Sequence, residues 1–189
     1  MKYKVIMDNL KQFLSCLNEK SSVEDVQKTF AKIAEILLNK SHIITNYGKY
    51  RIMEIEFYFY NPNHIDSVTI PRDEEAGMWW LHDWGVDITF KSDEKMNFYG
   101  GILIRSLFNE NNSEFICGPR KCCWDLFYSS AIKPAETPYI IIDKNDADIL
   151  GTTERFIPGE NKGIKENYRY FVQGIDTKAL KGYKDSPWK

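Results

Sequence analysis

The stretch that decides the fold is RIMEIEFYFY, Arg51 to Tyr60. Its alternation of side chains predicts a β-strand, because successive residues of a strand point to opposite faces of the sheet. One face is wholly apolar, while the other carries two carboxylates and two phenols. Such a polar face is either exposed to solvent or lines a site. The apolar face comprises Met53, Ile55, Phe57 and Phe59, and the other comprises Ile52, Glu54, Glu56, Tyr58 and Tyr60.

The sequence before this strand is helical in pattern. Apolar residues recur at helical spacing from Met7 to Leu17 and again from Val23 to Leu37. Ser21-Ser22 predicts the N-cap of the second helix, and acidic residues follow it in the first turn, where the helix dipole favours them. After Asn39 the period changes to two. We therefore expect two helices followed by a hairpin, with strands at Ser41–Asn46 and Tyr50–Tyr60 and a turn at Tyr47–Lys49.

The sequence after this strand predicts further strands and one short helix. Met78 to Phe90 is rich in aromatic residues and has a possible bend at Gly85. Pro119 to Tyr128 reads as a helix with proline in its first turn. Strands are predicted at Tyr99–Leu107, Tyr139–Asp143 and Tyr168–Gln173. We expect one α+β domain with a mostly antiparallel, curved sheet flanked by helices. Its parts are an N-terminal helical extension at 1–29, a core at 30–178 and a tail at 179–189.

Composition narrows the class of protein. The chain has 189 residues, of which 43% are hydrophobic and 28% charged, so a packed core is expected. A formal net charge of −2 gives no overall basic footprint for nucleic acid, although a local basic patch is compatible with it. No cysteine or histidine cluster has zinc spacing, and no apolar run approaches the ~20 residues that span a bilayer. We expect a cytoplasmic monomer with reduced cysteines that neither binds a metal or cofactor nor enters a membrane.

Collinear segments of the chain resemble the alkyladenine (3-methyladenine, methylpurine) DNA glycosylases. FAKIAEILLNK is similar to the family's "LARxLLGK", YRIMEIEFY to "RIVETEAY", GILIRSL to "VLLRAL", GPRKCCWDL to "GPxKLCQAL" and RYFVQG to "RFYVRG". His64 followed by TIPRD is similar to the family's histidine and "TPRN" region, and Thr153–Ile157 is similar to "TPRVGI". The resemblance runs in the same order through most of the chain.

The resemblance implies a hydrolase of base excision repair that removes an alkylated or deaminated purine from damaged DNA by base flipping. Glu56 matches the general base that activates water for attack on the sugar, and Arg105 matches an arginine near that water. Tyr58, His64 and Trp80 match or lie near residues of the base pocket. Trp84-Gly85 takes the place of the wedge that fills the gap left by the flipped base. Gly118 and Lys121 match a helix start that contacts DNA phosphate. The expected DNA glycosylase is monofunctional and uses no cofactor.

Several positions differ from the family pattern and keep other functions open. Asp83 and Asp87 flank the wedge, where carboxylates oppose phosphate. Thr89 and Lys91 stand near the place of a family asparagine that screens purines. One alternative is an N-glycoside hydrolase that acts on single-stranded nucleic acid or on free nucleosides or nucleotides. Another is a catalytically inactive module that binds a base. If DNA is the partner, four cations should gather at the pocket mouth: Arg72, Arg105, Arg120 and Lys121.

Overall fold

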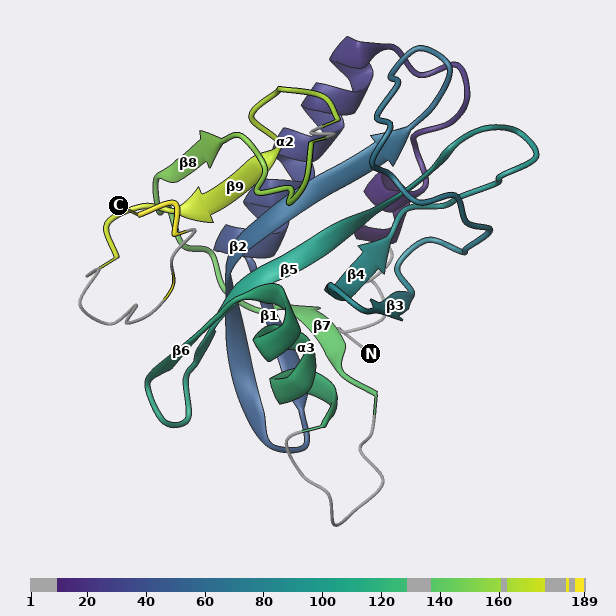
Figure 1. The fold of residues 1–189 in the computed structure, drawn as a ribbon. Coiled ribbons are helices and arrows are strands. Elements are labelled where there is room, and N and C mark those ends of the chain that lie inside the picture. The colour runs from purple at the N-terminus through teal and green to yellow at the C-terminus, as the bar shows by residue number, and fades with distance from the viewer. Residues whose placement is uncertain (1–9, 129–136, 161–162, 176–182, 184–185, 189) are drawn as a thin grey trace.

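The computed structural model of the chain describes residues 10–128, 137–160, 163–175, 183 and 186–188. Within these residues the chain forms one α+β domain with a curled antiparallel sheet and few helices (Figure 1). The helices are α2 (Val23–Asn39) and α3 (Pro119–Phe127), and residues 10–14 form a further helical turn. The strands are β1 (Ser41–Thr45), β2 (Gly48–Tyr60), β3 (Trp79–His82), β4 (Gly85–Thr89), β5 (Tyr99–Asn109), β6 (Glu114–Cys117), β7 (Tyr139–Ile142), β8 (Leu150–Thr153) and β9 (Arg169–Val172).

Strand β2, which contains the segment Arg51 to Tyr60, lies at the centre of the sheet. The main strand order is β3-β4-β5-β2-β1-β7, while β6 pairs with β5, and β8 and β9 are joined to β2 through β9. β2 pairs with β5 along most of its length, and its segment Glu54–Glu56 also pairs with β9 on the other side. Both neighbours are antiparallel to it. Neither Glu54 nor Glu56 is exposed at all, because side chains of β5 and β9 cover their carboxylates.

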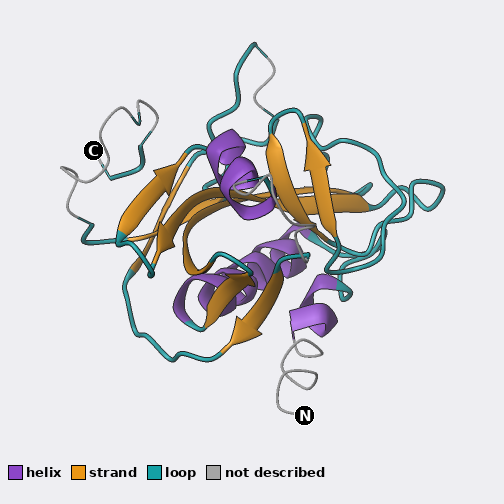
Figure 2. Ribbon diagram, turned by 90° about the horizontal axis from the view of Figure 1, so that it is seen from below, coloured by secondary structure: helices purple, strands orange, loops and turns teal. Residues whose placement is uncertain are grey.

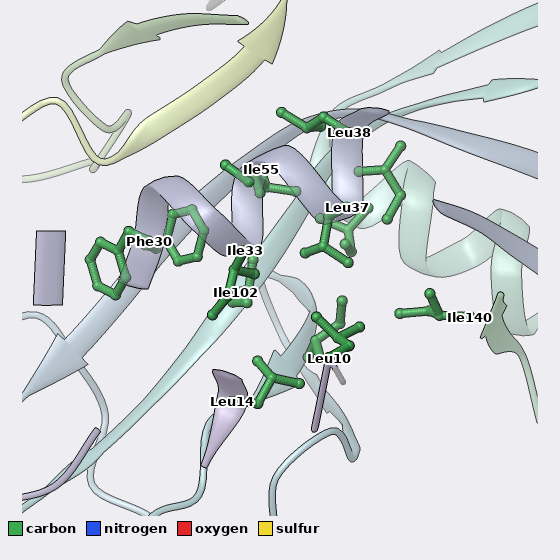
Figure 3. Close-up of a cluster of buried hydrophobic side chains, with 14 of the residues drawn as sticks. Leu10, Leu14, Phe30, Ile33, Leu37, Leu38, Ile55, Ile102 and Ile140 are labelled. Atoms are coloured by element: carbon green, nitrogen blue, oxygen red, sulfur yellow. The ribbon is translucent and has the colours of Figure 1, made fainter. Parts of the chain in front are cut away.

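Helix α2 covers the apolar face of β2. Its Ser22–Asp25 capping box matches the predicted N-cap, and the buried residues of α2 recur at helical spacing. Phe30 stacks on Phe57 with ring centroids 4.3 Å apart. Figure 3 shows side chains of α2 packed beside Ile55 of β2 and Ile102 of β5. In Figure 2, α2 and α3 lie on opposite sides of the sheet, where α2 packs on β2 and α3 packs on β4, β5 and β6.

The N-terminal residues belong to this same core. Leu10, Leu14 and Leu17 are buried in one cluster with the side chains of α2, and Figure 3 shows Leu10 and Leu14 in this cluster. The predicted boundary between residues 29 and 30 falls inside α2, which runs unbroken across it. Val23, which we placed on the buried stripe, is exposed at the first turn of the helix. The predicted helix from Met7 begins outside the described residues.

The structure corrects the predicted strands at three places. The first hairpin turns at Asn46-Tyr47, one residue before the predicted turn, because Thr45 pairs directly with Gly48. Strands β6 and β8 were not predicted. Each is only four residues long and neither has a clear alternation of buried and exposed residues, so the sequence pattern has little signal there.

No helix that the structure describes is long and apolar enough to cross a membrane.

The end of the chain also differs from the loose tail that we expected. Most of residues 179–189 lie outside the described residues, but Tyr183 is buried and its hydroxyl lies 3.0 Å from a carboxylate oxygen of Glu54. Trp188 packs edge-on against Phe171 of β9. Two aromatic residues of the predicted tail therefore contact the sheet.

Candidate functional site

A pocket of about 580 Å³ opens beside the start of α3. This volume lies within the range of sites that hold small organic ligands. Its walls come from β2, the β3–β4 hairpin, β5, the start of α3 and two loops. The residues that line the pocket include Tyr58, Arg72, Trp80, His82, Trp84, Asp87, Arg105, Cys117, Gly118, Pro119, Arg120, Lys121, Phe156, Ile157 and Pro158.

Glu56 lies directly behind the wall of this pocket. Its carboxylate is fully buried and is not part of the lining, but three of its hydrogen-bond donors are. The Tyr58 hydroxyl donates to Oε2 at 2.8 Å, and Arg105 Nη1 donates to the same oxygen at 3.1 Å. The backbone N–H of Phe156 donates to Oε1 at 2.7 Å. These three groups stand between the pocket and the carboxylate.

A buried network of charges holds Arg105 in this position. Its Nε donates to Glu54 at 3.1 Å while Nη1 donates to Glu56, so one guanidinium bridges the two glutamates of β2. Arg169 of β9 also donates to Glu54, at 2.6 Å from Nε. Burial works to lower the pKa of Arg105, but Glu56, Tyr183 and Glu54 outweigh it and raise the pKa. Arg105 therefore stays cationic beside the pocket at any physiological pH.

Tyr58 is fixed between the pocket and a second buried ion pair. Burial, followed by the charge of Glu56, raises the pKa of Tyr58 well above its ordinary value, so the phenol stays protonated and donates to Glu56. The guanidinium of Arg155 lies 4.5 Å from the ring centre. Arg155 in turn forms a two-pronged pair with Asp66, with nitrogen–oxygen distances of 2.6 and 2.9 Å. The Tyr58 ring is thereby held rigidly at the pocket wall.

The opposite wall is built around Trp80 and Asp87, which are paired across the β3–β4 hairpin. The guanidinium of Arg72 lies 3.7 Å from the centre of the Trp80 ring and donates to Asp87 at 2.9 Å. His82 Nε2 lies 3.1 Å from the other oxygen of Asp87. Asp87 is almost fully buried. The charge of Asp87 therefore balances Arg72 within the wall. Its place in the sequence had suggested that it would face a bound phosphate.

The tip of this hairpin is attached to the start of α3. Trp84 lines the pocket and remains 56% exposed. Gly85 has φ of +150°, and a Cβ added there would lie 2.9 Å from Cβ of Pro119, so only glycine allows this contact without strain. Arg120 Nε donates to the carbonyl of Asp83 at 2.7 Å, and its guanidinium lies 5.4 Å from the Trp84 ring centre. Two segments that are distant in sequence thus form one rim of the pocket.

The structure brings together most of the residues predicted for the site. Glu56 lies behind the pocket and Gly85 supports its rim, whereas His64 does not line it. The four cations expected at the mouth, Arg72, Arg105, Arg120 and Lys121, all line the pocket. Two of them are paired inside the wall, which leaves Arg120 and Lys121 as its exposed cations. The predicted site residues that line the pocket are Tyr58, Trp80, Trp84, Arg105, Gly118 and Lys121.

His64, which we expected at the base pocket, does not line the pocket beside α3. His64 is buried in the core, where Nδ1 lies 2.7 Å from the carbonyl of Phe59 and Nε2 lies 2.9 Å from the hydroxyl of Tyr168. Its ring packs edge-on against Phe30 of α2. The loop after β2 turns back at Asn61 and inserts the imidazole under the sheet instead of over it. Arg155 is the residue that lies over the Tyr58 ring.

This burial predicts a loss of stability in acid. Burial lowers the pKa of His64 from its ordinary value of 6.5, so the unfolded chain takes up this proton more readily than the folded one. The contribution of neutral His64 to the free energy of unfolding is fully present above pH 6.5. It is lost as the pH falls from 6.5 toward the lower pKa of the folded state. In urea denaturation between pH 8 and 5, we expect His64→Gln to show a shallower loss than the wild type. Parallel curves would contradict the assignment.

Several residues of the site escaped the sequence analysis. The loop 156–158 closes one side of the pocket, and Phe156 supplies a backbone donor to a carboxylate 100 positions earlier. Backbone donors carry no sequence signal. His82 was missed because a lone histidine on a strand has no distinctive pattern, although its place opposite Gly85 in the hairpin register was within reach of the turn prediction.

Two types of chemistry have no support in the described part of the chain. No group of three or more His, Cys, Asp or Glu side chains there is arranged to hold a metal ion. Cys117 lines the pocket, but burial raises the pKa of its thiol, so the reactive thiolate is disfavoured. The side chains that could exchange protons there are His82 and Asp87, which line the pocket, and Glu56, which lies behind its wall.

Comparison with known proteins adds one distant relative. No protein-family model matches the sequence. An uncharacterized protein of Acanthamoeba polyphaga mimivirus is 32% identical over 115 residues, an alignment that covers 48% of this chain and 52% of the viral protein. The chain thus spans about half the length of that relative. The viral protein is itself uncharacterized, so its similarity assigns no activity.

Proposed function

We propose that the protein hydrolyses the N-glycosidic bond of a damaged purine nucleotide held out of a DNA strand. The observation that carries the proposal is the carboxylate of Glu56, which is hydrogen-bonded to three residues of a pocket lined by aromatic rings and cations. The resemblance of collinear segments to the alkyladenine DNA glycosylases supports the same reaction. We expect neither a metal ion nor a cofactor to take part.

The proposed reaction begins with a water held between Glu56 and the sugar. The water oxygen forms a bond to C1′, the bond from C1′ to the base nitrogen breaks with its electron pair moving to the base, and Glu56 takes the proton of the water. The sugar passes through a state with oxocarbenium character, which a nearby carboxylate stabilises. The departing base takes up a proton from solvent, Glu56 releases its proton to solvent, and an abasic site remains.

The remaining pocket residues suit a nucleotide in this position. Rings of Tyr58 and Trp80 offer apolar walls to a base, and stacking of this kind contributes roughly 1–3 kcal/mol per base. Arg120 and Lys121 lie at the first turn of α3, where the N-terminal end of the helix also favours a phosphate. Trp84 at the exposed rim is placed to fill the gap left by a base that leaves its stack.

The depth of Glu56 favours a second candidate, a module that binds a base without cleaving it. The carboxylate is screened from the pocket by Tyr58, Arg105 and Phe156, and all three are its hydrogen-bond donors. A general base must come within hydrogen-bond reach of its proton, although catalytic contacts often tighten only when substrate binds. The two candidates share the pocket and differ in whether water enters behind its wall.

The experiment is a base-release assay with the full chain. Oligonucleotides that contain hypoxanthine or an alkylated adenine, both single-stranded and duplex, are incubated with protein and treated with alkali, which cleaves at abasic sites. We expect cleavage at the modified position only. Binding of the modified strand without cleavage identifies the binding module. Free inosine is incubated in parallel, and release of hypoxanthine from inosine but from no strand, followed by chromatography, identifies a nucleoside hydrolase. If the protein neither binds nor cleaves any of these probes, the proposal is overturned.

A further inference from the structure

The exposed side of α3 carries an unusual stripe of side chains. Arg120, Trp124 and Tyr128 follow one another at intervals of four residues and are all exposed, with Trp124 at 64% and Tyr128 at 52%. The two rings are stacked, with centroids 5.4 Å apart and planes 24° apart. Arg120 continues the stripe to Trp84 at the rim of the pocket. We name these four residues the α3 stripe.

The burial pattern of α3 shows that core packing does not account for this stripe. The inner side of the helix uses Cys122, Cys123 and Leu126 to contact the sheet. Its acidic residue, Asp125, interacts with the buried hydroxyl of Tyr50 and so belongs to the inner side as well. Within the described part of α3, the outer side therefore presents two large aromatic rings and two cations, Arg120 and Lys121, and no carboxylate.

We propose that the α3 stripe binds the single-stranded nucleic acid that continues from the nucleotide in the pocket. Bases next to that nucleotide stack on Trp124 and Tyr128, while Arg120 and Lys121 contact the connecting phosphates. Cationic grooves with exposed aromatic rings are the usual means of binding single strands without sequence preference. The inference rests on the proposed function, because the pocket is what places a nucleotide at the start of the stripe.

The chemistry of the stripe favours a single strand over a duplex. Base faces in a duplex are already stacked on their neighbours, so exposed rings on a protein meet them only where the strand is open. A duplex would also bring a second phosphate backbone to a protein of net charge −2, whose hairpin tip exposes Asp83. One strand needs only the narrow cationic path that Arg120 and Lys121 provide.

The test measures binding of an unmodified, fluorescently labelled DNA strand of about 12 nucleotides, alone and annealed to its complement. We expect the single strand to bind more tightly than the duplex. Trp124→Ala and Tyr128→Ala should each weaken single-strand binding by roughly 5- to 150-fold, the range for loss of one stacked base. Lys121→Ala should reduce the slope of log affinity against log salt by about 0.7.

The matched control is Tyr139→Ala, which removes an equally exposed tyrosine from β7 and should leave the affinity unchanged. Circular dichroism checks that each variant is folded. Unchanged single-strand binding in both α3 variants, or equal binding of duplex and single strand, overturns the inference. The readout needs no base release, so a wild type that binds through the stripe but releases no base contradicts only the proposed function. Base release that is independent of the stripe contradicts only this inference.

Discussion

Glu56→Gln is expected to lower the rate of base release by about 10²- to 10⁴-fold, the range for loss of a general base, while binding of the modified strand is retained. Glutamine has nearly the shape of glutamate, but it cannot take a proton from water and carries no charge to stabilise the sugar cation. The measurement is single-turnover cleavage with protein in excess, which separates the chemical step from binding.

The control for this variant is stability, because Glu56 is buried against cations. Its neutralisation leaves Arg105 with less compensation, and the amide must turn its N–H₂ group away from the guanidinium. Urea denaturation of Glu56→Gln therefore accompanies the assay, which is run where both proteins are fully folded. Tyr58→Phe is the matched variant: it removes one donor to Glu56 but leaves the carboxylate in place. We expect it to lose less activity than Glu56→Gln.

A folded Glu56→Gln protein that releases base at the wild-type rate would exclude Glu56 as the base. The reaction would then depend on another group of the pocket. If instead the wild type binds the modified strand and neither protein releases base, the screened position of Glu56 is the functional one. The pocket then serves recognition.

Local periodicity predicted most of the central fold. The alternation in β2, the capping box of α2 and the proline at the start of α3 are each decided within a few residues. The opening question about β2 was harder, since the same alternation fits an exposed face or a buried one. The answer came from groups 100 or more residues away, because Arg169 of β9 donates to Glu54 and the backbone N–H of Phe156 donates to Glu56. No local pattern contains that information.

The candidate site was predicted in part for the same reason. Residues on regular strands and at helix starts, such as Tyr58, Trp80 and Lys121, lie where their elements place them. Asp87 looked like an obstacle to nucleic acid until its pairing with Arg72 was known, and that pairing joins a loop to a hairpin. His64 does not line the pocket, because the direction of a loop depends on which of its side chains it can bury. An imidazole with two partners beneath the sheet is more stable there than in a solvated pocket.

The second large effect is expected in stability, from Asp66→Ala. Asp66 and Arg155 are both buried, and they form a pair with two short contacts. Removing the carboxylate leaves the guanidinium buried without its counter-charge, which costs about 3–5 kcal/mol in comparable cases. The hydroxyl of Thr69 loses its acceptor as well. The measurement is the free energy of unfolding in urea, with the slope compared to that of the wild type.

Two further variants show whether the isolated charge is the cause. Glu24→Ala breaks the exposed i,i+4 pair with Lys28 on α2 and should change the stability far less, because water already solvates both charges. Asp66→Ala combined with Arg155→Met removes both charges and should recover part of the loss, since a flexible apolar side chain refills the space beside Tyr58. If the double variant is less stable than Asp66→Ala, the hydrogen bond from Arg155 to the carbonyl of Phe57 matters more than the ion pair. Arg155 would then act mainly by holding β2 to the loop that carries Phe156, the residue whose N–H contacts Glu56.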